Sequence, residues 1–211
     1  MNHTPQSNAR PARKRGRRHP IATIALVAIG LLGTGGVYAL ATSSATAETT
    51  VQAQEQVANG GKLFAANCAT CHGMALQGTA DGPTLVGVGA ASVDFQVGTG
   101  RMPMAQSGPQ AEQKPVQFTA EQIAALAAYV DSVGGGPSIP TDEQLTASSD
   151  LAAGGELFRI NCAMCHNVAG AGGALTEGKF APPLTGVLPV HVWEAMVIGP
   201  QNMPVFNDQN I

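Results

Sequence analysis

Hydrophobic and polar positions divide this chain of 211 residues into an apolar N-terminal segment and a longer segment of mixed character. Residues 21–41 contain no charged side chain over 21 positions, a length that suits a membrane-spanning helix. Residues 55–67 predict a short helix, and residues 120–133 predict a second helix with one apolar face. Between these two helices the chain is rich in loop-forming residues and shows few strand signals.

The predicted helix over 120–133 has both side-chain periodicity and end signals. Its apolar residues recur at i, i+3, i+4 and i+7, on Ile123, Leu126, Ala127 and Val130. Thr119 and Gln122 predict a capping box at its start, and Gly134 predicts its end. A stretch rich in Gly, Pro and Ser follows over 132–150, in which Thr141–Gln144 predicts the start of one short helical turn.

Charge is distributed unevenly along the chain. Six of the eleven Lys and Arg residues lie between Arg10 and Arg18, whereas the first acidic residue is Glu48. From Glu48 onward there are 14 acidic and 5 basic residues, so this part has a formal charge of −9 (5 − 14), against −3 for the whole chain. A basic run is typical of nucleic-acid-binding arms. Here the apolar span follows it directly, which indicates a topology signal with a cytoplasmic N-terminus and no nucleic-acid partner.

The apolar span fits either a retained anchor or a cleaved signal peptide. Its length favours an anchor, whereas Ala45-Thr46-Ala47 before Glu48 has the small residues of a cleavage site. In both cases, the residues after about position 48 are expected on the outer face of the cell membrane.

The longer segment contains an internal repeat. Gly60–Cys68 matches Gly154–Cys162 at an offset of 94 residues, and Pro83–Val88 matches Pro182–Val187 at an offset of 99. The second copy therefore has five extra residues between these matches. Self-similarity on this scale indicates a duplicated domain. We expect a basic N-terminus over 1–19, a transmembrane helix over 20–41, a linker over 42–54, a first domain over 55–136, a linker over 137–150 and a second domain over 151–211.

Each copy of the repeat contains one Cys-x-x-Cys-His pattern. The two patterns are Cys68-Ala69-Thr70-Cys71-His72 and Cys162-Ala163-Met164-Cys165-His166, and they include all four cysteines. This is the attachment signature of a c-type haem, in which the thiols form thioethers and the adjacent His ligates the iron. A disulfide pair and a zinc site are the alternatives, but neither requires a His directly after each second Cys. The low aromatic content, 4%, agrees with haem, because two haems supply apolar bulk.

These features resemble class I cytochrome c domains over residues 55–211. The resemblance implies an all-α fold, with two tandem class I cytochrome c domains after an N-terminal transmembrane helix. In that family an N-terminal helix crosses a C-terminal helix at a glycine and an aromatic residue. The residues that match this crossing are Gly60, Phe64, Leu126 and Tyr129 in the first domain, and Gly154 and Phe158 in the second.

The same resemblance implies the site residues. Covalent attachment of two haem c groups is implied at Cys68, Cys71, Cys162 and Cys165. Axial iron ligands are implied at His72 and Met102 in the first domain and at His166 and Met203 in the second, each Met preceding a Pro. The carbonyls of Pro83 and Pro182 are implied as acceptors for the proximal histidines.

Other residues compete for the distal position. Met104 lies two residues from Met102, and His191 is the other His of the exported part, although a lone loop His is more often solvated. Trp193 and Met196 are expected to pack near the second haem. Imidazole and thioether together complete the iron coordination, which favours electron transfer over haem-centred catalysis.

More narrowly, the layout resembles the dihaem cytochrome c subunit (cytochrome cc) of actinobacterial cytochrome bc1 complexes. The matching segments are Gly98–Pro103 and Asn202–Phe206. The resemblance implies a subunit of a menaquinol–cytochrome c reductase (translocase) that has no turnover alone. Its partners would be a cytochrome b subunit, a Rieske iron–sulfur subunit that supplies electrons, and an aa3-type cytochrome oxidase that accepts them.

One departure from the family concerns the second domain. It has no counterpart of the 120–133 helix, so we expect the natural protein to continue with an amphipathic helix and a membrane span. The alternative functions are an electron-accepting subunit of another periplasmic dehydrogenase or of a cbb3-type oxidase, and a dihaem peroxidase. A peroxidase needs an open coordination site, and the two Met-Pro steps argue against one.

Overall fold

The computed structural model describes residues 20–106, 108–146, 150–207 and 209–210, without the side chains of residues 40–41 and 43–47. The basic run predicted over 1–19 lies outside the described residues. The chain divides into two compact units, residues 1–51 and residues 52–211.

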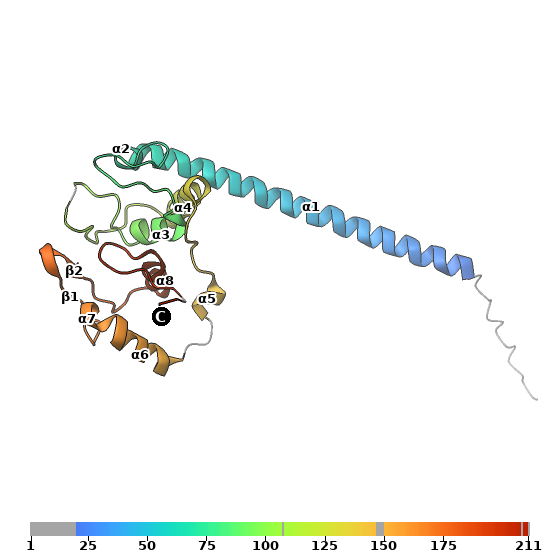
Figure 1. The fold of residues 1–211 in the computed structure, drawn as a ribbon. Helices are drawn as coiled ribbons and strands as arrows, with labels where there is room; N and C mark the ends of the chain where they lie inside the picture. The colour runs from blue at the N-terminus through green and yellow to red at the C-terminus, as the bar shows by residue number, and fades with distance from the viewer. Residues whose placement is uncertain (1–19, 107, 147–149, 208, 211) are drawn as a thin grey trace, which may run out of the picture. The chain divides into compact units, whose positions relative to one another are not determined.

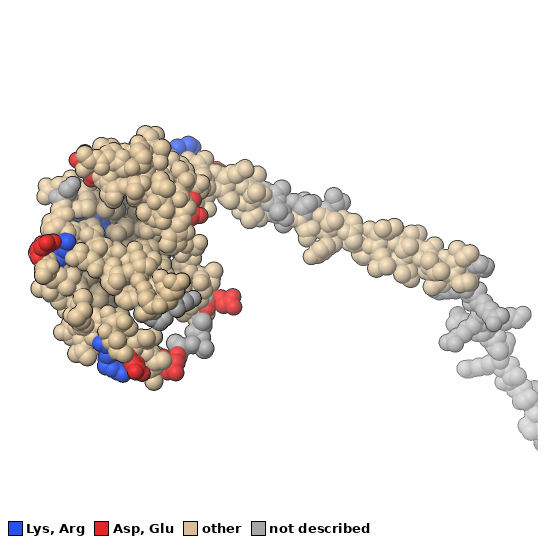
Figure 2. All heavy atoms as spheres, viewed as in Figure 1, with Lys and Arg blue, Asp and Glu red and all other residues tan. Residues whose placement is uncertain are grey.

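In the first unit, the described residues belong to helix α1, which spans Pro20–Asn67. Its segment Pro20–Ala39 has 20 residues, a mean hydropathy of 1.9 and no buried part, so its length and composition suit a membrane crossing. Figure 2 shows no Lys, Arg, Asp or Glu on the visible face of this segment. The predicted helix is confirmed. Residues 42–54, predicted as a linker, belong to the same helix, because no Gly or Pro interrupts the chain from 37 to 59.

In the second unit, the first copy of the repeat contains the end of α1 and three further helices (Figure 1). These are α2 at Ala69–His72, α3 at Gly89–Gly98 and α4 at Ala120–Gly134. The predicted capping box of α4 is confirmed. Thr119 Oγ1 accepts from the Gln122 N–H at 3.3 Å, and Gln122 Oε1 accepts from the Thr119 N–H at 2.9 Å. The helix ends one residue later than predicted, where Gly135 has a φ of 63°.

The predicted crossing of the two helices is also confirmed in the first copy. Phe64 on α1 is buried against α4, and its ring lies 5.4 Å from that of Tyr129, centroid to centroid. Gly60 lies against Ala125, where an added Cβ would overlap the carbonyl oxygen. The buried core around the crossing consists of Phe64, Leu76, Val93, Val97, Ile123, Leu126, Ala127 and Val130.

Helix α3 was not predicted from the sequence. Its buried residues alternate along the chain, at Gly89, Ala91, Val93, Phe95 and Val97, which is a pattern typical of strands. The helix nevertheless forms because it packs against α4 and also against α8, so it is buried on more than one side. A helix with two buried sides lacks the single apolar stripe by which sequence patterns identify helices.

The second copy contains helices α6 at Leu151–Asn161, α7 at Ala163–His166 and α8 at Pro189–Ile198. The predicted turn in the linker forms helix α5 at Asp142–Thr146. Helix α6 presents apolar side chains to solvent: Ile160 is 68% exposed, and a Cβ added at Gly154 would meet nothing within 4 Å. Among the described residues, therefore, Phe158 and Gly154 have no counterpart of the α1–α4 crossing.

The fold is mostly helical, but it is not purely α as predicted. Strand β1 at Gly173–Ala174 pairs antiparallel with β2 at Phe180–Ala181, and the one-turn helix η1 at Thr176–Gly178 joins them. This hairpin lies in the loop where the second copy has its five extra residues. The five extra residues are therefore accommodated within this loop, because loops tolerate insertions. The division of residues 52–211 into two tandem domains stays a prediction, since they form one compact unit.

Candidate haem sites

The first Cys-x-x-Cys-His pattern lies on one helical turn at the end of α1. The Cys68 N–H donates to the Phe64 carbonyl at 2.8 Å, and the His72 N–H donates to the Cys68 carbonyl at 3.0 Å. The imidazole is oriented by its Nδ1, which lies 2.8 Å from the carbonyl oxygen of Pro83. With Nδ1 as donor, Nε2 keeps a free lone pair and can bind a metal.

The second pattern repeats this geometry. The His166 N–H donates to the Cys162 carbonyl at 2.9 Å, and His166 Nδ1 lies 2.9 Å from the Pro182 carbonyl oxygen. The predicted partner of each histidine is thus confirmed. In both copies Nε2 is therefore the nitrogen that stays free to coordinate a metal, although the loops between His and Pro differ in length.

The four cysteines are free thiols, so the disulfide alternative has no support in the structure. Burial, with a smaller contribution from Cys71, raises the pKa of the Cys68 thiol to about 11. Burial and Cys165 likewise raise the pKa of Cys162. The zinc alternative has no support either. Within the described residues, no Cys belongs to a cluster of three or more side chains with metal-ligand spacing.

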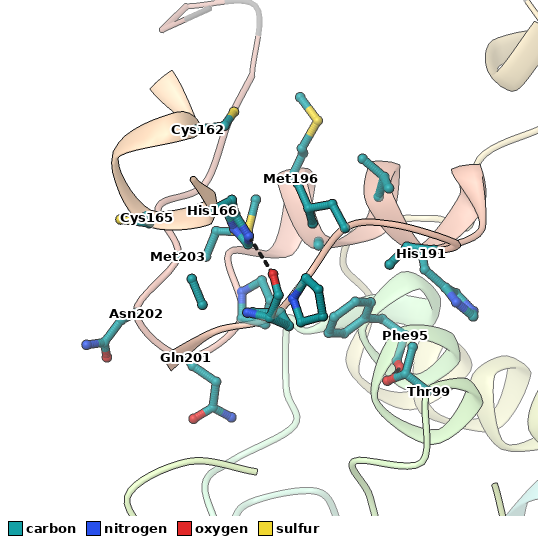
Figure 3. A pocket seen from close by; sticks show the side chains of 18 of the residues that line it. Phe95, Thr99, Cys162, Cys165, His166, His191, Met196, Gln201, Asn202 and Met203 are labelled. Atoms are coloured by element: carbon teal, nitrogen blue, oxygen red, sulfur yellow. Dashed lines mark hydrogen bonds between the residues drawn. The ribbon is translucent and has the colours of Figure 1, made fainter. Parts of the chain in front are cut away.

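A cavity of about 670 Å³ lies beside the second pattern. Cys162, Cys165, His166, Met196 and Met203 are among its lining residues, and Figure 3 shows their side chains. This volume is within the range of cofactor pockets, about 300–1,000 Å³. The donor set, two thiols, an imidazole with Nε2 free and a thioether, fits a haem c.

The loops after α3 and α8 position the two predicted distal methionines. The Met102 N–H donates to the Gln96 carbonyl on α3 at 2.9 Å, and Met102 packs partly buried against the core of the first copy. The Met203 N–H donates to the Pro200 carbonyl at 3.0 Å, after Gly199 ends α8 with a left-handed φ of 57°. Met203 therefore lines the cavity, whereas its assignment as a ligand stays a prediction.

The expectation of a solvated loop His at position 191 was wrong. His191 lies on α8 with a side chain only 15% exposed, and its Nε2 lies 3.9 Å from an Asp94 carboxylate oxygen on α3. Burial lowers the pKa of His191; Arg101 also lowers it, and Asp94 raises it. Met196 lines the cavity as expected, whereas Trp193 is not among the described lining residues.

Contacts between the two copies were missed entirely by the sequence analysis. The side-chain amide of Gln110 donates to the Phe180 carbonyl at 2.9 Å and accepts from the Phe180 N–H at 2.8 Å. Phe95 on α3 meets the ring of His191 edge-on, with 6.3 Å between centroids, and Arg101 lies 4.8 Å above the Phe95 ring. No sequence signal marks these pairs, because Gln110 and Phe180 are 70 residues apart.

Comparisons with known proteins agree with this geometry. Residues 57–134 match the family described as cytochrome c, and residues 149–211 match subunit III of cbb3-type cytochrome c oxidase. The cytochrome bc1 complex cytochrome c subunit of Corynebacterium efficiens is 41% identical over 225 residues, which cover 98% of this chain and 76% of the relative. The chain belongs to this family.

Other relatives carry the same name. The cytochrome bc1 complex cytochrome c subunit of Mycobacterium bovis is 43% identical over 88% of this chain and 69% of its own length. That of Mycobacterium leprae is 42% identical over 88% and 67%. The predicted family is therefore confirmed. Its cytochrome c domains imply covalently bound haem c and an electron-transfer role in a bc1 complex, and the apolar part of α1 fits a membrane anchor.

Proposed function

We propose that the chain binds two haem c groups, one in each copy of the repeat. The thioether bonds would form at Cys68 and Cys71 and at Cys162 and Cys165, and the axial ligands would be His72 with Met102 and His166 with Met203. The observation that carries this proposal is the repeated bond from His Nδ1 to a proline carbonyl, at 2.8 Å and 2.9 Å. Such a bond fixes the ring and leaves Nε2 for iron.

The chain's own residues would hold each haem and exclude water from it. In the first copy, Cys68 and Met102 are partly buried against the same apolar core, which would cover part of the haem. In the second copy, the cavity beside His166 would be filled by the macrocycle. A haem c with His and Met ligands exchanges one electron and has no open site for oxygen or peroxide. This coordination favours a carrier over the alternative of a dihaem peroxidase.

We infer that the chain passes electrons from a Rieske iron–sulfur subunit to an aa3-type terminal oxidase, as part of a menaquinol-oxidising bc1 complex that also contains cytochrome b. Two carriers on one chain make the transfer between them intramolecular and independent of a diffusing cytochrome c. The relatives named as bc1 complex cytochrome c subunits support this role over a dehydrogenase or cbb3-type oxidase subunit.

The proposed topology has a cytoplasmic N-terminus, a membrane span at Pro20–Ala39 and haem-binding copies on the outer face of the cell membrane. The acidic character of the chain after Glu48 suits this placement beside basic partner surfaces. Protease treatment of intact spheroplasts should therefore digest residues 52–211 and protect the N-terminus.

Haem content tests the first part of the proposal. A pyridine haemochrome assay with mass spectrometry should find two haems per chain that survive denaturation. The double variant Cys68→Ala with Cys71→Ala should retain one haem, and the matched variant Cys162→Ala with Cys165→Ala should retain the other. Finding a single haem in the wild type, or both haems in either variant, would contradict the proposal.

Purification in mild detergent from native membranes tests the assignment of partners. We expect co-elution with cytochrome b, a Rieske protein and aa3-type oxidase subunits, and quinol oxidase activity without added cytochrome c. Recovery of the chain with a soluble dehydrogenase, or with cbb3-type oxidase subunits alone, would overturn the assignment and leave the haem proposal intact.

A further inference from the structure

Three side chains with metal-binding atoms meet where α3 of the first copy packs against α8 of the second. They are Asp94 on α3 and His191 and Glu194 on α8, and their ligand atoms all lie within 4.8 Å of one another. His191 and Glu194 are three residues apart on one helix, so they lie on the same face. All three residues lie outside the Cys, His and Met sets assigned to haem; His191 competed for the distal position in the sequence and also lines the cavity beside His166.

Glu194 is the unusual member of this cluster. The residue is 0% exposed, and neither of its carboxylate oxygens has a hydrogen-bond partner among the residues that the structure describes. Burial raises the pKa of Glu194 to about 9, with smaller contributions from the charge of Asp94 and from a side-chain interaction with it, so the carboxyl holds a proton at neutral pH. A buried carboxyl group without a hydrogen-bond partner is costly, because buried polar groups in proteins are normally hydrogen-bonded or bound to a metal. The two Glu194 oxygens are therefore free to bind a ligand.

We propose that Asp94, His191 and Glu194 form a binding site for a divalent transition-metal cation, with Zn²⁺ as the best chemical match, between the two copies of the repeat. One imidazole and two carboxylates are a ligand set that zinc accepts, with metal–ligand distances of about 2.0–2.2 Å. Zinc would displace the proton that Glu194 holds at neutral pH and release it to solvent, and the two ionised carboxylates would then balance one divalent cation. The mixed N and O donors favour zinc over calcium or magnesium, which prefer oxygen alone.

The geometry needs only a small contraction to accept the ion. Tetrahedral zinc places its ligand atoms about 3.4 Å apart, given those bond lengths. His191 Nε2 already lies 3.9 Å from Asp94 Oδ2, and the largest separation in the cluster is within 4.8 Å. The required movement of about 0.5–1.5 Å is within reach of side-chain torsions and small helix shifts.

Arg101 is a positively charged group close enough to this cluster to act on His191. Its guanidinium stacks on Phe95 and adds positive charge, which opposes a cation. Burial lowers the pKa of His191, Asp94 opposes this shift and Arg101 adds to it, and the net lowering favours the neutral imidazole, the form that binds a metal. Two carboxylates outnumber the single guanidinium, so the local balance still favours a divalent ion.

A bound cation would join α3 to α8 and thus fix the two copies of the repeat against each other. This structural role does not depend on the proposed function, because it requires neither haem nor a partner protein. It predicts that zinc stabilises the folded chain, because a ligand that binds only the folded state shifts the folding equilibrium toward that state.

The experiment uses the full, untagged, haem-loaded chain in detergent, stripped with a chelator and then titrated with ZnCl₂. Calorimetry and elemental analysis should give one zinc per chain for the wild type. Glu194→Gln and Asp94→Asn, which preserve side-chain shape, should each weaken zinc binding at least tenfold. Glu143→Gln, at an exposed position on α5, is the matched control and should bind zinc as the wild type does.

Circular dichroism and haem absorbance establish that each variant is folded, and Asp94→Asn decides the question if Glu194→Gln does not fold. Two results would overturn the proposal. One is a wild-type chain that takes up no stoichiometric zinc. The other is uptake that survives in both variants, which would mean that Asp94 and Glu194 share a proton instead of a metal.

Discussion

The internal repeat supplies a paired experiment on the helix crossing, because Gly60 and Gly154 are equivalent in sequence but not in surroundings. A Cβ at position 60 would overlap the Ala125 carbonyl oxygen and lie 2.8 Å from the Tyr129 Cβ. Both groups belong to the rigid α4 helix and cannot rotate away. At position 154 an added Cβ would meet nothing within 4 Å. We therefore expect Gly60→Ala and Gly154→Ala to have opposite effects on stability.

The magnitudes follow from two opposing effects. Alanine is favoured over glycine within a helix by about 0.5–1 kcal/mol. Overpacking a well-packed contact costs about 1–3 kcal/mol, and a backbone oxygen places position 60 at the upper end. Gly60→Ala should thus destabilise the folded state by about 1–2 kcal/mol net, whereas Gly154→Ala should stabilise it by about 0.5–1 kcal/mol. For a compact unit of the size of residues 52–211, each kcal/mol shifts Tm by about 2–4 °C.

Thermal unfolding of the haem-loaded chain measures both effects. Far-UV circular dichroism follows the helices of both copies, and fluorescence of Trp193, the only tryptophan in the chain, follows the second copy. Gly60→Ala should lower the Tm of the chain, and Gly154→Ala should not lower it. Equal shifts in the two variants, or a Gly60→Ala chain as stable as the wild type, would refute the reasoning.

The remaining predictions concern the ligands, a helix cap and the contact between copies. Met102→Ala and Met203→Ala should each remove one thioether–iron charge-transfer band and lower the potential of one haem in a redox titration. Met104→Ala should change neither the band nor the potential. If Met104→Ala has these effects and Met102→Ala does not, the distal ligand of the first haem is Met104. Thr119→Ala removes the cap of α4 and should cost about 0.5–2 kcal/mol in denaturant unfolding. Gln110→Ala removes two hydrogen bonds to Phe180 and should increase amide hydrogen exchange in the β1–β2 hairpin, without changing α4.

Elements with local signals were predictable from the sequence. The Cys-x-x-Cys-His patterns, the Thr119 capping box and the short turn at α5 depend on residues a few positions apart, and the structure has each of them. The crossing at Gly60 was predictable through resemblance, since a glycine and an aromatic four residues later mark it. The bonds from His72 and His166 to proline carbonyls were predictable in the same way.

Features that depend on tertiary burial were not predictable. Helix α3 is buried toward both α4 and α8, so its apolar residues alternate and the stripe expected of a surface helix disappears. The predicted linker at 42–54 is helical, because no Gly or Pro there ends the helix. Glu194 is a further case, because an acidic residue is expected at the surface and this one is fully buried.

The placement of α3 and α8 connects the contact between the copies to both candidate haem sites. The two helices are equivalent in the repeat, and each is followed by the loop that carries a predicted distal methionine. The Met102 N–H is held by the Gln96 carbonyl on α3, and the Phe206 N–H is held at 2.7 Å by the Met196 carbonyl on α8. Because the helices that pack on each other also hold these loops, a change at their contact acts on both loops at once. The surface between the copies is thus part of the structural support of both sites.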